Sequence, residues 1–145
     1  MTLGITVRLA AVGQFLPEIP EAVMPKSFRL RYRGVRGRIP LNVRLPGVIK
    51  TRHAVVHITA GQVRDAQASS IIVGGQSLMQ DFIYNLGDAD VWISNVSPHG
   101  ENDHFPGEPG GVEFILHVDY PDPLDVAVTI CVDDAPPVSI SDADT

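Results

Sequence analysis

Apolar and charged residues alternate strictly from position 28 onward, and this pattern constrains the fold more than any other feature of the chain. Phe28, Leu30 and Tyr32 would point to one side of an extended segment, and the arginines between them would point to the other. This is the period-2 signature of a half-buried β-strand. The parity then reverses, so that the next apolar set is Ile39, Leu41, Val43 and Leu45. Two strands of opposite parity are therefore expected.

The reversal begins at a glycine and predicts a β-hairpin. A two-residue loop would place Gly34 at the position that needs a positive φ. In that register Arg33 faces Arg36, and Arg31 faces Arg38. Like charges directly opposite on a ladder destabilise it by roughly 0.2–1 kcal/mol per pair. We therefore expect an anionic partner for this face, which the acidic part of the chain, a neighbouring copy or a separate polyanion such as nucleic acid would supply.

The remainder of the chain also has the composition of an all-β protein. Thirteen glycines and twelve prolines punctuate it. Further strands are expected at residues 5–9, 53–59, 71–73, 81–86, 89–96, 112–119 and 124–132. A short helix is plausible only at residues 60–70. We predict an antiparallel two-sheet β-sandwich or jelly roll of about eight to ten short strands with little helix.

The length of 145 residues favours a single domain. We assign residues 1–132 to the β-sandwich and residues 133–145 to an acidic, proline-containing C-terminal tail or edge strand, which could add to a sheet of its own chain or of a neighbour. The single cysteine, Cys131, excludes an intrachain disulfide and a cysteine-based metal site. We find no signal peptide and no apolar run long enough for a membrane span, so a soluble chain is expected and no membrane partner.

Charge is strongly segregated along the sequence. All eleven basic residues and two of the seventeen acidic residues lie within residues 1–64, which gives this part a net charge of +9 and leaves −15 on the rest. The basic face predicted as an interaction surface consists of Arg29, Arg31, Arg33, Arg36, Arg38 and Arg44.

A second candidate site is the loop at residues 98–111. Its possible ligands are His99, Glu101, Asn102, Asp103 and His104, and Glu108 lies further along the same loop. Oxygen-rich clusters suit Ca²⁺, whereas the histidines would let a transition metal compete. The spacing matches no standard metal motif, so the identity of any ion stays open. His53 and His57 would lie about 13 Å apart on a strand, too far to share an ion.

These features favour a non-enzymatic structural protein. Serines with no nucleophile motif and glycine pairs that precede no helix give no catalytic residues and no cofactor site. We expect a shell, coat-decoration or filament-type subunit that self-associates or docks on a lattice, using opposite charges on successive copies. The alternatives are a Ca²⁺-dependent carbohydrate or small-ligand binding module that uses the 98–111 loop, and a nucleic-acid binding protein that uses the arginine hairpin. The net charge of −6 disfavours nucleic acid.

Overall fold

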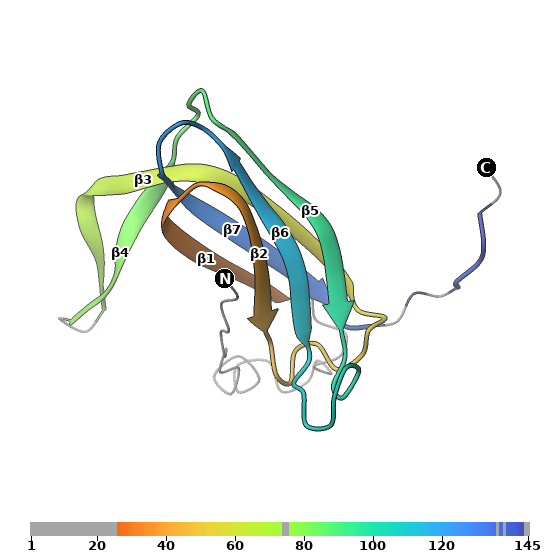
Figure 1. Cartoon of the computed structure of the whole chain (residues 1–145). Coiled ribbons are helices and arrows are strands. Elements are labelled where there is room, and N and C mark those ends of the chain that lie inside the picture. Colours follow the sequence, from red (N-terminus) through yellow and green to blue (C-terminus); the bar gives the residue numbers. More distant parts are fainter. Residues whose placement is uncertain (1–25, 74–75, 136, 138, 144–145) are drawn as a thin grey trace.

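The computed structural model describes residues 26–73, 76–135, 137 and 139–143. This part of the chain contains strands and no helix (Figure 1), which confirms the all-β class. The strands are β1 (Lys26–Val35), β2 (Gly37–Arg44), β3 (Val55–Val73), β4 (Gln76–Tyr84), β5 (Asp90–His99), β6 (Gly111–Asp119) and β7 (Leu124–Asp133). They form two antiparallel sheets, with the orders β1-β7-β3-β4 and β2-β6-β5.

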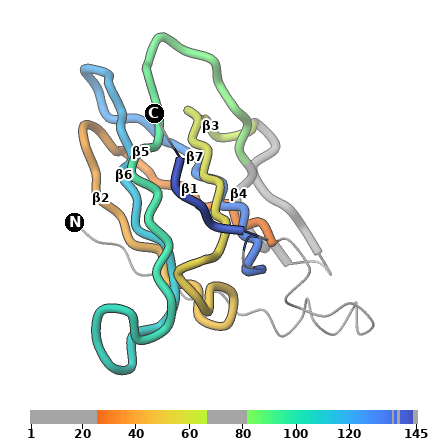
Figure 2. The backbone as a smooth tube through the Cα atoms, turned by 90° about the vertical axis from the view of Figure 1, so that its right-hand side faces the viewer, coloured from red at the N-terminus to blue at the C-terminus, as the bar shows by residue number. Residues whose placement is uncertain are grey.

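One hydrophobic core lies between the two sheets. In Figure 2, β2, β5 and β6 form one layer, and β1, β3 and β7 lie on the other side. Alternate residues of the central strands β6 and β7 fill the space between them. Their fully buried side chains are Val112, Phe114, Leu116, Val118, Val126, Val128, Ile130 and Val132. The sequence pattern therefore identified the buried face of both strands correctly.

The predicted arginine hairpin is wrong. β1 pairs with β7 and β2 pairs with β6, so β1 and β2 belong to different sheets. Gly34 does have a positive φ, of 61°, but Arg36 and a second such glycine, Gly37, then carry the chain from one sheet to the other. A corner of this kind also reverses the parity, because the inner side of the second sheet faces back toward the first. Arginines of β1 and β2 therefore do not face one another.

The helix suggested for residues 60–70 is also wrong, because these residues lie within β3. The separate strands expected at 53–59 and 71–73 fall in one long strand, which begins at Val55. Small and polar residues with weak strand propensity extend as β-structure here because β7 pairs with β3 as far as Gln62, and β4 pairs with it from Val63 onward. Pairing with neighbouring strands has overridden local preference.

Two further predictions concern the ends of the chain. The strand expected at residues 5–9 lies outside the described residues. Ser139 and Ile140 have no strand assignment, and Ile140 is 75% exposed. Among the residues with a described structure, no helix is long and apolar enough to cross a membrane.

Tyr32 on β1 is a polar exception in the core. Only 7% of the residue is exposed, and its hydroxyl group has no hydrogen-bond partner in the described structure. Burial raises the pKa of Tyr32 to about 12. The hydroxyl therefore costs desolvation energy that no hydrogen bond offsets.

Replacing Tyr32 with Phe should leave the free energy of unfolding near pH 7 unchanged or raise it by about 1 kcal/mol, because the unsatisfied hydroxyl is removed. Above pH 10 the native chain should lose stability relative to Tyr32→Phe, because the unfolded state gives up the tyrosine proton before the folded state does. At about pH 11 this additional loss is about 1 kcal/mol. Urea unfolding at both pH values measures these differences, and a variant clearly less stable near pH 7 would contradict the assignment.

Candidate functional site

The ligand-rich loop connects β5 to β6 and rests on the turn between β2 and β3 at one end of the sandwich. The backbone N–H of Leu45 donates a hydrogen bond to the carbonyl oxygen of Gly110 at 2.9 Å, and the N–H of Glu101 donates to that of Lys50 at 3.1 Å. Beneath this contact, Leu45 and Ile49 are fully buried. The loop is therefore held against the core at both of its ends.

Asp103 helps to fold the loop. One of its carboxylate oxygens accepts a hydrogen bond from the backbone N–H of Gly100 at 2.7 Å, and the other lies 3.3 Å from Nη1 of Arg52. The Gly100 hydrogen bond lowers the pKa of the Asp103 carboxyl; desolvation opposes this shift and Arg52 adds to it. These carboxylate oxygens are thus already engaged within the loop.

Asn102 and Glu101 also lie away from any shared ligand position. Asn102 has a φ of 63°, and its Oδ1 accepts a hydrogen bond from the N–H of Gly107 at 2.7 Å. Glu101 is exposed. Of the five predicted loop ligands, the structure brings only the two histidines together.

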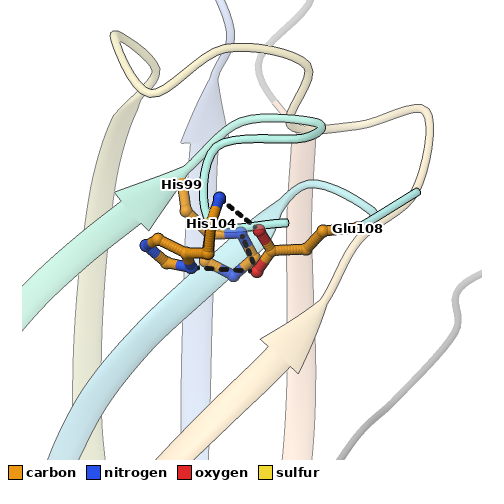
Figure 3. Close-up of side chains that lie close together, drawn as sticks. All are labelled: His99, His104 and Glu108. Atoms are coloured by element: carbon orange, nitrogen blue, oxygen red, sulfur yellow. Dashed lines mark hydrogen bonds and ion pairs between the residues drawn. The ribbon is translucent and has the colours of Figure 1, made fainter. Parts of the chain in front are cut away.

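The two histidines converge on Glu108 (Figure 3). His99 is the last residue of β5, and the other two residues belong to the loop. Glu108 Oε1 lies 3.0 Å from Nδ1 of His104 and 3.4 Å from Nδ1 of His99. Its other oxygen, Oε2, accepts a hydrogen bond from the backbone N–H of His104 at 2.9 Å. One potential ligand atom from each residue lies within 4.8 Å of the others.

His99 is buried and oriented by β2. The residue is 3% exposed, and its Nε2 lies 3.2 Å from Oδ1 of Asn42. Because an amide oxygen can only accept, the tautomer that makes this hydrogen bond carries its hydrogen on Nε2. In that tautomer Nδ1 presents a lone pair toward Glu108, and Nδ1 has no hydrogen-bond partner in the described structure.

Glu108 is a buried carboxylate, with 6% of the residue exposed. Burial on its own would raise the pKa of its carboxyl. Hydrogen bonds from the backbone and the side chain of His104, together with electrostatic attraction to the His99 and His104 rings, outweigh burial and lower that pKa below its ordinary value. The group is therefore kept as an anion beside two imidazole rings.

Sequence reasoning placed Glu108 in the loop without including it in the site. The signal that could have included it is the Pro106-Gly107 pair, which is typical of a type II turn. The N–H of Glu108 donates to the carbonyl oxygen of Phe105 at 3.2 Å, and Gly107 has a φ of 85°. This turn folds Glu108 back onto His104. No sequence signal connects Asn42 to the loop.

Acidic residues of the same chain neutralise two of the three arginines of β1. Arg31 Nη1 lies 2.8 Å from Oδ1 of Asp65. Arg33 Nη2 lies 3.5 Å from the same oxygen, and Arg33 Nη1 lies 3.7 Å from Oδ2 of Asp125. Arg29 donates a hydrogen bond to Thr129 Oγ1 at 2.9 Å. Of the three anion sources expected, the chain itself supplies one for this set of arginines.

Aromatic side chains of β4 cover the same arginines. The guanidinium carbon of Arg29 lies 5.5 Å from the centroid of the Tyr84 ring, and that of Arg31 lies 5.2 Å from the Phe82 centroid. Cation–π contacts of this kind contribute about 0.5–1 kcal/mol at exposed positions. The β1 arginines therefore attach the base of the β3–β4 hairpin to the four-stranded sheet.

The β2 arginines lie on the other sheet. Nη1 of Arg36, which precedes β2, donates a hydrogen bond to the carbonyl oxygen of Pro121 at 2.6 Å. Arg38 and Arg44 are exposed, and neither forms an ion pair with another described residue. The six arginines expected on one face are thus divided: three lie on β1, Arg36 lies between the strands, and Arg38 and Arg44 lie on β2, where no other described residue neutralises their charge.

No protein-family model matches this chain, and searches of curated proteins and of solved structures found no significant match.

The loop can approach the β2–β3 turn only because Gly110 lacks a side chain. A Cβ atom at this position would lie 1.6 Å from the carbonyl oxygen of Ile49. We expect Gly110→Ala to lower the free energy of unfolding by about 3 kcal/mol, because backbone has to move. Gly107→Ala is the matched control, because its Cβ would meet no atom within 4 Å and only its positive φ is strained, at about 1 kcal/mol. Equal urea midpoints for the two variants would contradict the close approach.

Proposed function

We propose that this protein is a non-enzymatic subunit of a larger protein assembly, and that it associates with further copies of itself. The observation that carries this proposal is the outer part of the β3–β4 hairpin, which leaves the body of the sandwich as a two-stranded ribbon (Figure 1). The exposed charge of Arg38 and Arg44 on β2 is a second observation that supports the proposal.

The ribbon extends well beyond the sandwich. β7 pairs with β3 from Val55 to Gln62, and from Val63 to Val73 β4 is the only described strand that pairs with β3. An isolated two-stranded ribbon is marginally stable in water and usually needs a third strand or a packing surface. A neighbouring subunit would provide that surface, and this would account for a hairpin longer than its own sandwich can cover.

A break in the ladder directs the ribbon away from the body. Asp65 pairs with Phe82, but the next pair is Ser70 with Gln80, so β3 contains several more residues than β4 across this interval. Extra residues on one strand bend and twist a hairpin. Arg31 holds the residues just before the bend through Asp65 and Phe82. The base is therefore fixed and the outer part is presented outward, as expected of an assembly arm.

Charge supports self-association through opposite patches. The basic 1–64 part carries +9 and the rest of the chain −15, and the exposed Arg38 and Arg44 are not neutralised by described residues of their own chain. Complementary patches on two surfaces of one subunit generate head-to-tail contacts, which give rings or fibres. The same copy could thus offer a basic sheet face to an acidic surface of the next.

Strand order supports the jelly-roll variant of the sandwich as part of this proposal. The first two described strands pair with the last two in nested fashion, β1 with β7 and β2 with β6, and each pair lies in a different sheet. A long folded hairpin wrapped around a core produces this nesting. Jelly rolls occur in viral shells and in lectins, so the topology is compatible with assembly without determining it.

Removing the ribbon should abolish association and spare the sandwich. A variant in which Asn-Gly replaces residues 67–80 keeps the base of the hairpin and the pairs formed by Val63, Arg64 and Asp65. We expect the full chain to form oligomers in size-exclusion chromatography with light scattering, and the variant to be monomeric with an unchanged β-sheet circular dichroism spectrum. Oligomers of equal mass in both proteins, or a monomeric full chain at micromolar concentration, would contradict the proposal.

The basic face of β2 should make association sensitive to salt. We expect Arg38→Glu with Arg44→Glu to reduce the oligomer mass at low salt, and high salt to do the same to the native chain, because screening weakens contacts between exposed charges. Arg52→Gln is the control, because this exposed arginine pairs with Asp103 of its own chain and belongs neither to β2 nor to the ribbon. Absorbance at 260 and 280 nm during the same run detects bound nucleic acid, which would favour the nucleic-acid alternative instead.

A further inference from the structure

We propose that His99, His104 and Glu108 form a Zn²⁺ site, with Asn42 as the residue that orients His99. The proposal is independent of the assembly function. It rests on the arrangement of three donor atoms and on one buried nitrogen atom whose lone pair no hydrogen bond uses.

The donor atoms have the spacing of ligands on one ion. Nδ1 of His104 and Nδ1 of His99 lie 3.0 Å and 3.4 Å from the same oxygen of Glu108, and one ligand atom from each residue falls within 4.8 Å of the others. Two ligands of a tetrahedral zinc ion lie about 3.3 Å apart, given bonds of about 2.0–2.1 Å. Small side-chain adjustments would therefore bring all three atoms to coordinating distance.

His99 already has the environment of a metal-binding imidazole. Its Nε2–H is directed at Asn42 Oδ1, which leaves the lone pair of Nδ1 pointing toward the Glu108 carboxylate. A protonated Nδ1 would donate a short hydrogen bond to that oxygen, of about 2.7–2.9 Å, whereas the two atoms are 3.4 Å apart and form no hydrogen bond. Metal-ligating histidines commonly donate their second N–H to an oxygen acceptor in this way.

The chemistry of the donor set favours zinc over calcium. Two imidazole nitrogens and one carboxylate oxygen match the ligands that Zn²⁺ prefers, while Ca²⁺ takes six to eight oxygens. Within the described part of the chain, no fourth His, Cys, Asp or Glu joins the three. His104 has a side chain that is 54% exposed, so water can reach the ion from its side and complete a tetrahedron. Zn²⁺ would take the place of the proton between His104 and Glu108.

Isothermal titration of the chelator-treated full chain with ZnCl₂ tests the proposal. We expect one ion per chain, and a rise in the thermal midpoint when Zn²⁺ is present, because the ion binds only the folded loop. His104→Ala should weaken binding by about a hundredfold or more, because one of three ligands is lost. This variant should fold, since the imidazole is half exposed and the backbone N–H that contacts Glu108 is kept.

The matched control is His53→Ala with His57→Ala, which removes two exposed histidines of the same chain and should leave the affinity unchanged. Asn42→Ala should reduce the affinity for Zn²⁺ by about ten- to a hundredfold, because the His99 ring is no longer held in its orientation. Titration of the native chain with Co²⁺ should give the intense visible absorption of a tetrahedral nitrogen and oxygen site, and this readout depends on no variant. Absence of stoichiometric Zn²⁺ binding, or equal binding by His104→Ala, would overturn the proposal.

Discussion

Two sheets share one apolar core, and this constraint determines on which side of each sheet the charged residues of the strands lie. Alternate residues of β6 and β7 fill the core, so the residues between them are directed outward. The same alternation places the β1 arginines on the outside of one sheet and Arg38 and Arg44 on the outside of the other. Burial of the inner face stabilises the fold by about 25 cal/mol for each Å² of apolar surface removed from water. The arginine positions are a geometric consequence of that burial.

The ends of the sandwich have separate roles. At one end the 100–110 loop packs on the turn that follows β2, and the close approach at Gly110 fixes its position. This packing holds His99 and Glu108 away from solvent while His104 stays half exposed. Elsewhere the β3–β4 ribbon extends away from the body. A fixed ligand cluster and an extended arm thus coexist on one rigid core, and they can be tested independently.

Charge segregation in the sequence has two different structural outcomes. Arg31 and Arg33 of β1 pair with Asp65 and Asp125, which lie far away in the sequence, so part of the +9 and −15 division cancels within one chain. The β2 arginines Arg38 and Arg44 find no such partner among the described residues. Exposed ion pairs contribute little stability, about 0–1 kcal/mol each. Arg38 and Arg44 are therefore the arginines to test for a role in association, where they would speed the encounter between subunits and fix their relative position.

The sequence alone determined the all-β class, the buried faces of β1, β2, β6 and β7 and the ligand-rich character of the 98–111 loop, because period-2 alternation and loop composition are local properties. It could not distinguish a hairpin from a corner at Gly34, because both reverse the parity in the same way. It also could not place Asn42 beside His99 or Asp65 beside Arg31, since these contacts depend on which strands pair. Only the tertiary structure decided them, because pairing between distant strands is set by how the two apolar faces close on one core.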